Sequence, residues 1–206
     1  MVKGTPELIN ERRETIINAC EELYQTMSFR EISLKEIGKN VPFSRPTIYN
    51  YFETKEEIFL ALFEREYRSW NRDLEAILNG QEELASEELA DRIAMSLTKR
   101  KQLLKLLSMN NYDMEENSRE ERLVCFKEAY GRSMELMKEL LRKYCKKKDE
   151  DIERFLYIFY PFMFGIYPYA EVTKKQKKAM EEAGIDYTYQ SIYEITYNCL
   201  IRLLEE

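Results

Sequence analysis

The fold of this chain is decided by residues 33–52, SLKEIGKNVPFSRPTIYNYF, which have the pattern of two short helices around a tight turn. Ser33 is a suitable N-cap for the first helix, and Glu36 is placed to complete a capping box. Pro42 cannot continue that helix, so the chain must turn before it. Pro46 suits the first turn of the second helix, where its missing N–H has no helical partner. The stretch therefore predicts a helix–turn–helix.

The second of these helices has one apolar and one polar side. Ile48 and Phe52 are four residues apart and predict the buried side. The outward side chains are expected to be Arg45, Thr47, Tyr49, Asn50 and Tyr51. Basic, hydroxyl and amide groups suit the base edges and phosphates of nucleic acid. This helix is therefore a candidate DNA-reading element.

The charge of the chain is acidic overall but locally basic at this motif. The net charge is −6, which argues against a protein that coats nucleic acid through bulk charge. Residues 35–55 nevertheless carry four basic and two acidic side chains. A small basic surface on an acidic body fits a protein that depends on specific contacts. The lysines and arginine at residues 142–148 are read as a solvated helix end, with a second nucleic-acid site as the alternative.

Several classes of chemistry are excluded by composition. The chain has no histidine, which removes His-based acid–base catalysis, Ser-His and Cys-His nucleophiles and the commonest metal ligand. It also has no Gly-rich phosphate loop and no metal-ligand spacing. We therefore expect no enzyme activity, no cofactor and no metal site.

The cysteines and the apolar segments indicate a cytoplasmic protein. Cys20, Cys125, Cys145 and Cys199 are far apart and without CxxC spacing, so we expect reduced thiols in helix cores. A redox-sensing pair is the alternative, and it would need exposed thiols of low pKa. We find no signal peptide and no run of about 20 apolar residues that could span a membrane.

The rest of the chain has helical periodicity throughout, which predicts an all-α fold. Helices are expected at about 6–27, 54–78, 86–98, 99–109, 119–147, 151–169, 174–182 and 189–203, with a polar loop at 110–118. We divide the chain into a DNA-binding domain at 1–55 and a larger helical domain at 56–206. The helix from Thr54 is shared by both domains and could act as a lever between them.

The segment 151–169 is apolar on nearly all sides, which is typical of a helix buried by several neighbours. In a chain of this size, we expect one of those neighbours to be a second subunit. The helices that carry Phe162 and Leu200 are candidates for a four-helix bundle in a homodimer. Burial within the monomer alone is the alternative.

The stretch from Ser44 to Phe52, together with Lys55, resembles the recognition-helix signature of the tetracycline-repressor (TetR) family of transcriptional regulators. The resemblance is detailed over about the first quarter of the chain, and length and helical pattern match beyond it. It implies an N-terminal three-helix DNA-binding domain and a larger helical domain for ligand binding and dimerisation. It also implies a dimeric repressor that binds a pseudo-palindromic operator and is released by a small-molecule effector.

The resemblance also implies the DNA contacts. Arg45, Pro46 and Thr47 would read base edges, and Tyr49, Tyr51 and Lys55 would bind phosphates. The full predicted set is Lys35, Ser44, Arg45, Pro46, Thr47, Tyr49, Asn50, Tyr51 and Lys55. The alternative is that Arg45 and Lys55 are ordinary surface charges and that Tyr49 or Tyr51 belongs to the core.

An effector pocket is implied in the larger domain, and the sequence supplies aromatic side chains for it. The candidates are Phe63, Tyr67, Trp70, Met109, Tyr112, Phe126, Tyr130, Met134, Phe159 and Phe162. A lipophilic or cationic aromatic effector would suit such a pocket. An aromatic stripe at helical spacing is also what a simple core requires.

The chain departs from the family pattern at the turn. The family commonly has Gly where Ser28 and Pro42 stand, and Ala where Gly38 stands. Since proline cannot adopt a positive φ, the turn must be built differently, for example with Asn40 in the left-handed region. A rival function is a helical interaction or ligand-binding protein whose motif no longer binds DNA specifically. That rival would not need Arg45.

Overall fold

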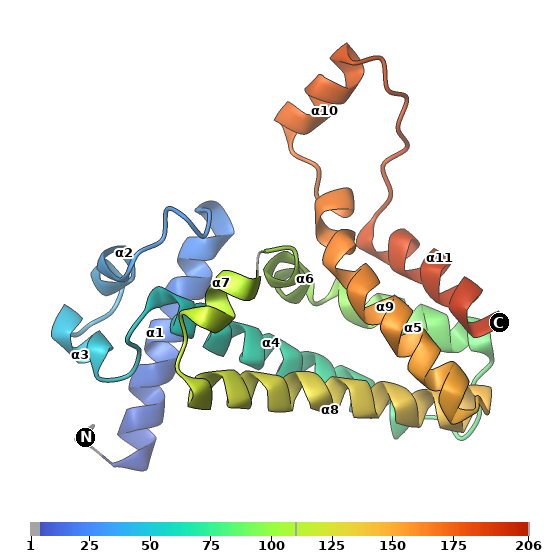
Figure 1. The fold of residues 1–206 in the computed structure, drawn as a ribbon, viewed down its shortest axis with the longest axis horizontal. Coiled ribbons are helices and arrows are strands. Elements are labelled where there is room, and N and C mark those ends of the chain that lie inside the picture. The colour runs from blue at the N-terminus through green and yellow to red at the C-terminus, as the bar shows by residue number, and fades with distance from the viewer. Residues whose placement is uncertain (1–4, 110, 206) are drawn as a thin grey trace. The chain divides into compact units, whose positions relative to one another are not determined.

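A computed structural model describes residues 5–109 and 111–205, and these residues form helices and no strand. The predicted all-α fold is confirmed. The helices are α1 (Pro6–Thr26), α2 (Leu34–Lys39), α3 (Arg45–Tyr49), α4 (Lys55–Leu78), α5 (Ser86–Thr98), α6 (Lys101–Leu107), α7 (Asn111–Glu116), α8 (Glu120–Cys145), α9 (Asp149–Ala170), α10 (Lys174–Glu182) and α11 (Ile192–Glu205), shown in Figure 1.

The chain folds into two compact units that do not follow a single cut in the sequence. The first holds the described residues of 1–65 and 110–129, and the second those of 66–109 and 130–206. Two helices, α4 and α8, begin in the first unit and end in the second. The domain division between residues 55 and 56 stays a prediction.

The first unit is built on α1 and the first half of α4. The guanidinium of Arg65 on α4 donates to the side chains of three α1 residues, at 3.2 Å to Glu14, 2.6 Å to Asn18 and 2.7 Å to Glu21. The fully buried side chains of this unit include Ile16, Ile17, Ile37, Ile48, Phe52 and Phe59. These apolar groups hold α2 and α3 against α1 and α4, since helices this short are not stable alone.

The turn between α2 and α3 is made without a positive φ. The N-cap prediction for Ser33 is confirmed, because its hydroxyl accepts from the Glu36 amide at 3.2 Å. The capping box does not form, since the Glu36 carboxylate pairs with Lys39 at 2.9 Å instead. The suggestion of a left-handed Asn40 is wrong, because its φ is −108°. Its side-chain amide donates to the Glu36 carbonyl at 3.0 Å and closes the helix end.

The polar segment after residue 109 contains a helix where a loop was predicted; Asn110 itself lies outside the described residues. Helix α7 runs over Asn111–Glu116. Met114 is 1% exposed and gives this short helix an apolar anchor. The side chains of Asn117 and Ser118 donate to the carbonyls of Asp113 and Met114 and close its end. The predicted loop missed these local bonds because its composition is polar.

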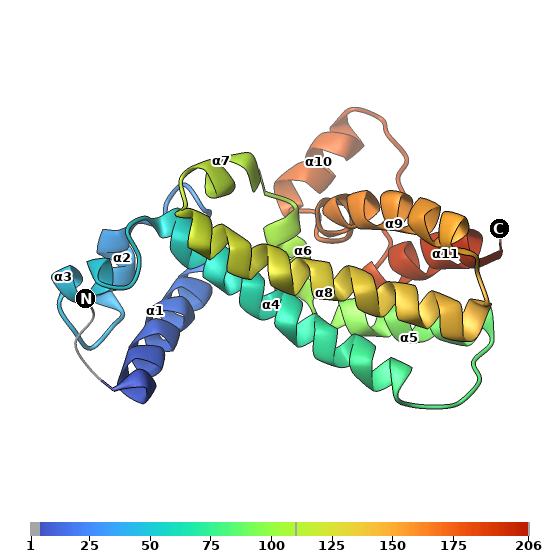
Figure 2. The same cartoon turned by 60° about the horizontal axis from the view of Figure 1, so that its bottom comes forward.

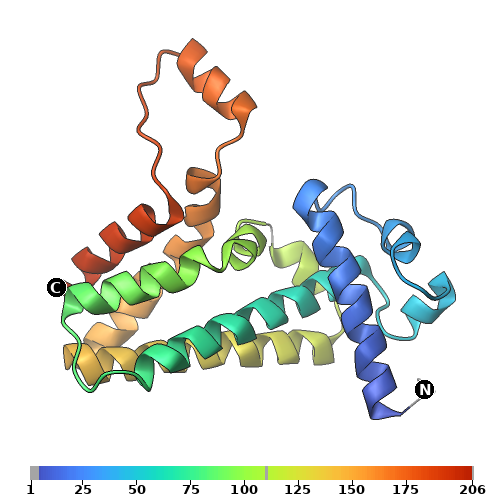
Figure 3. The ribbon, with the colours of Figure 1, turned by 180° about the vertical axis from the view of Figure 1, so that it is seen from behind.

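The second unit surrounds an aromatic cluster. Here the later parts of α4 and α8 lie side by side (Figure 2), and α11 lies along α5 (Figure 3). Tyr67 and Trp70 from α4 pack near Tyr130 of α8 and Tyr160 of α9. Burial raises the pKa of Tyr160, whose hydroxyl donates to Ser133 Oγ at 2.9 Å. The cluster is thus an internally bonded core.

One face of α9 is apolar and exposed. The inward side chains include Phe155, Phe159 and Met163, while Tyr157 is 81% and Phe164 42% exposed. Residues 171–191, here called the strap, carry α10 from the end of α9 to the start of α11 (Figure 1). The expectation that a second subunit covers one side of α9 stays a prediction.

We predict that Gly38→Ala raises the free energy of unfolding by about 0.5–1 kcal/mol, because glycine inside a helix costs more backbone entropy than alanine. A Cβ at residue 38 would lie 3.5 Å from Ile48 Cδ1, an ordinary contact. Urea unfolding measures the change. The matched control is Gly184→Ala, which should destabilise because residue 184 has φ +68°. A loss of stability in Gly38→Ala would contradict the packing described.

Candidate nucleic-acid interface

Helix α3 presents a polar face beside a buried apolar one. Ile48 and Phe52 are fully buried, as predicted from their spacing. Six of the predicted contact residues are exposed. Lys35 lies on α2, and the other five lie at α3 and its flanks: Ser44, Arg45, Pro46, Tyr49 and Asn50. Thr47 is half-buried, and its hydroxyl lies 3.0 Å from that of Ser44. Ser44 stands at the N-cap position but makes no side-chain bond to the helix backbone.

Arg45 and Tyr49 form one preorganised pair on this face. The Arg45 Nη2 donates to the Tyr49 hydroxyl at 3.1 Å, and the guanidinium carbon lies 5.7 Å from the ring centroid. Both side chains remain exposed. The pairing limits the rotamers of a long arginine before any partner arrives, which lowers the entropy cost of a base contact.

The prediction that Tyr51 faces outward is wrong. Its side chain is 4% exposed, and its buried hydroxyl has no hydrogen-bond partner among the residues described. The prediction extended the helical period through residue 52, but α3 ends at Tyr49. Beyond a helix end the period no longer fixes which way a side chain points. Tyr51 and Phe52 are both buried as a result.

Lys55 has a structural role that the sequence did not reveal. Its Nζ donates to the carbonyls of Phe29 at 2.7 Å and Ile32 at 3.1 Å, and lies 4.1 Å from the Phe29 ring centroid. These groups belong to the connector between α1 and α2. Lys55 therefore ties that connector to the start of α4, and its ammonium is already hydrogen-bonded in the absence of DNA.

A buried carboxylate stands at the start of α4. Glu57 is 1% exposed and accepts from Arg119 Nε at 2.6 Å, Arg119 Nη2 at 2.8 Å and the Glu53 amide at 2.8 Å. Burial by itself would raise the pKa of Glu57, but these hydrogen bonds outweigh it and hold the pKa below the ordinary value. The side chain is thus a buried, paired anion. Nothing in the local sequence marks it, because Arg119 is 62 residues away.

The ten candidate pocket residues are divided between the two units, and the single effector site expected in the larger domain stays a prediction. Phe63, Tyr112 and Phe126 belong to the first unit, where the rings of Phe63 and Phe126 are 4.9 Å apart. Tyr112 is 83% exposed on α7. The other seven belong to the second unit: Tyr67, Trp70, Met109, Tyr130, Met134, Phe159 and Phe162.

Within the second unit, three of these residues are core and one lines a cavity. Tyr67, Trp70 and Phe159 are at most 1% exposed. Phe162 lines an apolar cavity of about 440 Å³ with residues of α9, the strap and α11: Pro161, Gly165, Tyr169, Tyr187, Thr188, Gln190 and Ile195. Tyr67, Trp70 and Phe159 are therefore core residues, as the alternative interpretation predicts.

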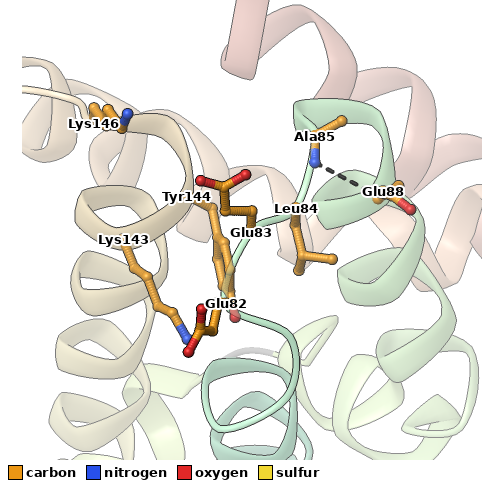
Figure 4. A pocket seen from close by; sticks show the side chains of 8 residues that line it. All are labelled: Glu82, Glu83, Leu84, Ala85, Glu88, Lys143, Tyr144 and Lys146. Atoms are coloured by element: carbon orange, nitrogen blue, oxygen red, sulfur yellow. Dashed lines mark hydrogen bonds between the residues drawn. The ribbon is translucent and has the colours of Figure 1, made fainter.

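A second cavity in the same unit, of about 570 Å³, has a charged lining (Figure 4). The segment Glu82–Ala85 faces the end of α8 there, with Lys143, Tyr144 and Lys146. Lys143 Nζ donates to the Leu78 carbonyl at 2.7 Å and the Tyr144 hydroxyl to the Gln81 carbonyl at 2.8 Å. These side chains close the end of α4, so their polar groups already serve the fold.

Three of the four cysteine thiols have a raised pKa. Burial raises the pKa of Cys20 to about 12 and of Cys199 to about 11, and also raises the pKa of Cys145. A redox sensor needs the opposite shift, which weakens that alternative for these three thiols. Within the described residues there is no cluster of three or more His, Cys, Asp or Glu side chains suited to a metal ion. Among the described residues, no helix is long and apolar enough to cross a membrane.

Comparison with known proteins places both parts of the chain in one group. Residues 16–62 match the family described as bacterial regulatory proteins, tetR family, and residues 64–190 match the tetracyclin repressor-like C-terminal domain. The HTH-type transcriptional regulator EthR of Mycolicibacterium smegmatis is 36% identical over 55 residues, 27% of this chain and 25% of EthR. YdgC of Bacillus subtilis, an uncharacterised HTH-type transcriptional regulator, is 28% identical over 87 residues, which are 42% of this chain and 44% of YdgC. The chain thus matches less than half the length of either curated relative.

Solved structures share the fold over nearly the whole chain. The fatty acid degradation regulator FadR from Bacillus halodurans superposes with a TM-score of 0.62 at 17% identity, covering 99% of this chain and 97% of its own. Thermus thermophilus FadR, a TetR family repressor solved with lauroyl-CoA, gives 0.56 at 21% identity, covering 95% and 94%. At these identities the likeness concerns the fold alone.

We predict that Lys55→Met lowers the free energy of unfolding by about 1–3 kcal/mol, because two part-buried carbonyls lose a charged donor. Urea unfolding gives the value. Lys39→Met, which removes an exposed lysine paired with Glu36, is the control and should change stability by less than about 0.5 kcal/mol. Unchanged stability in Lys55→Met, with a DNA-binding salt slope reduced by about one, would instead support the predicted phosphate contact.

A second prediction concerns acid. Since the folded pKa of Glu57 lies below its ordinary value of 4.5, its contribution to stability is present above about pH 4.5 and is lost as pH falls through the folded pKa. Glu57→Gln should therefore cost about 1–3 kcal/mol at pH 7, and the difference from the wild type should shrink below about pH 4. Urea unfolding across pH measures it. Glu121→Gln, at an exposed carboxylate 3.7 Å from Arg119, is the control; a pH-independent cost for Glu57→Gln would contradict the assignment.

Proposed function

This chain belongs to the TetR family of bacterial transcriptional regulators, and we propose that it is a ligand-responsive repressor that binds its operator as a homodimer. Members of this family are DNA-binding regulators and not enzymes. The observation that carries the proposal is the exposed face of α3, where Arg45 and Tyr49 are paired with each other. A helix kept only for packing would not need that face.

The proposed contacts follow from which side chains are free to reach DNA. Arg45 is the candidate for a guanine in the major groove, because a guanidinium can donate to both acceptors on that base. The Tyr49 hydroxyl and Lys35 are candidates for phosphates. The other proposed contacts are Ser44, Pro46, Thr47 and Asn50. Tyr51 is left out because it is buried, and Lys55 because its ammonium already binds two carbonyls.

The homodimer is supported by the outer face of α9. Tyr157, Pro161, Phe164 and Pro168 are all exposed and recur at helical spacing. A continuous apolar stripe in water is unfavourable and is typical of an interaction surface. We propose that α9 and α11 pair with their counterparts in a second copy. The two recognition helices would then enter successive major grooves about 34–36 Å apart on a pseudo-palindromic site.

The proposed effector is a small lipophilic or aromatic molecule. The second unit is rich in aromatic side chains, and the fold of Thermus thermophilus FadR was solved with lauroyl-CoA. A fold of this kind can therefore accommodate a lipophilic chain. An effector releases the operator only if it binds the DNA-free arrangement more tightly than the DNA-bound one.

Selection of bound duplexes from a random DNA pool at near-physiological salt tests the proposal. Enrichment of one two-fold-symmetric site is the expected result. If a folded protein enriches no sequence, both before and after unfolding and refolding to remove any bound ligand, the repressor proposal fails. The rival interaction protein would then be favoured.

We predict that Arg45→Ala weakens binding to the selected duplex by about 10- to 100-fold, because a bidentate arginine–guanine contact discriminates by about 1–3 kcal/mol. Fluorescence anisotropy with a labelled duplex gives the dissociation constant. Lys178→Ala on α10 removes one equally positive, 75% exposed side chain and is the control. Equal effects of the two substitutions would mean that Arg45 acts through bulk charge.

A further inference from the structure

The chain leaving the recognition helix is held by two arginines from the start of α8. Arg122 Nη2 donates to the Tyr51 carbonyl at 3.1 Å, and Arg119 Nη2 donates to the same carbonyl at 3.3 Å. Tyr51 is two residues past the end of α3. Both arginines are about 70 residues away in sequence, yet they belong to the same compact unit.

These donors are themselves fixed. The Arg119 guanidinium is anchored by both carboxylate oxygens of the buried Glu57, at 2.6 and 2.8 Å. The Arg122 guanidinium carbon lies 5.6 Å from the ring centroid of the fully buried Phe52. A cation–π contact and a two-point carboxylate contact restrict a guanidinium more than one hydrogen bond does. The Tyr51 carbonyl is therefore held from rigid points.

A third bond reinforces the same junction. The Thr54 hydroxyl donates to the Asn117 carbonyl at 2.9 Å and accepts from the Glu57 amide at 3.2 Å. Between the last turn of α3 and the first turn of α4, the chain is thus bonded to the α7–α8 junction at several points. The Nε of Arg122 is buried and has no hydrogen-bond partner in the described part of the chain.

We propose that Arg119 and Arg122 are positioning residues for the recognition helix. By fixing the Tyr51 carbonyl, they set the orientation of the five-residue α3, and with it the direction in which Arg45 and Tyr49 point. Neither arginine is assigned a contact with DNA. The inference rests on the proposed function for its consequence in DNA binding, but not for its effect on α3 itself.

The test is Arg122→Met, which keeps the apolar stem over Phe52 and removes the donor. Native-state hydrogen exchange reads α3 directly, through the amides of Tyr51 and Phe52, which both bond to the Ile48 carbonyl. We expect these amides to exchange about tenfold faster, with α1 amides unchanged, because one charge-assisted bond is lost at this point. The control is Arg132→Met, also on α8, whose partners are Glu75 and Glu139.

DNA binding supplies the second measurement, with the duplex selected by the wild type and a scrambled duplex of equal length. Arg122→Met should weaken binding to the selected duplex about tenfold and change binding to the scrambled one less than about twofold, because positioning affects base readout more than phosphate attraction. Arg122→Lys should recover part of the loss. If Arg122→Met fails to fold, Arg122→Lys against the wild type provides the comparison.

The proposal is overturned if the Tyr51 and Phe52 amides exchange at the wild-type rate. It is also overturned if exchange rises equally in α1 and α4, which would mean a general loss of stability. If the wild type selects no duplex, the repressor proposal fails, and the exchange experiment still decides whether the arginines position α3.

Discussion

In the first unit, the start of α4 is joined to the start of α8 by an ion pair between the buried Glu57 and Arg119. A carboxylate removed from water is unfavourable unless charged or strongly polar donors replace the water, and Glu57 is 1% exposed. Its donors come from the Glu53 amide and from Arg119 at the start of α8. Since the anion cannot stay buried without them, the start of α8 is fixed to the start of α4. The arginine that meets this requirement also reaches the Tyr51 carbonyl.

That arrangement matters because the direction of α3 is not fixed by α3 alone. A helix of five residues has too few hydrogen bonds to persist alone, so its direction is imposed by its surroundings. Ile48 and Phe52 fix its buried side, and the bonds to the Tyr51 carbonyl fix the chain that follows it. The exposed side remains for Arg45 and Tyr49, whose mutual contact needs nothing from the rest of the molecule. The side chains proposed to contact DNA and the side chains that anchor the helix thus lie on opposite sides of the five-residue α3.

Structural features that depend on residues close together in the sequence are predicted, and features that depend on partners far away in the sequence are missed. The Ser33 cap, the helical position of Pro46 and the burial of Ile48 all follow from spacings of a few residues. Tyr51 was misplaced because the helical period stops at residue 49. The hydrogen bonds of Lys55 and Glu57 within the fold were not predicted, because their partners lie 23 to 62 residues away. A lone charge in a sequence does not reveal whether it will meet water, DNA or a buried carbonyl.

From the sequence alone, the aromatic residues of the second unit cannot be assigned to the core or to a pocket, because both give the same helical periodicity. Here the polar atoms decide the matter: the Trp70 indole donates to Ser96 at 3.0 Å and the Tyr160 hydroxyl to Ser133 at 2.9 Å. These groups are already satisfied within the protein, so a molecule that binds among these rings must separate them or leave them buried and intact. Separation would disturb Ser133 and Tyr130, both on α8, the helix that begins beside Arg119. An effector that exploits this cluster would therefore act by changing the packing of α8, because only a difference in affinity between two packings can shift their equilibrium.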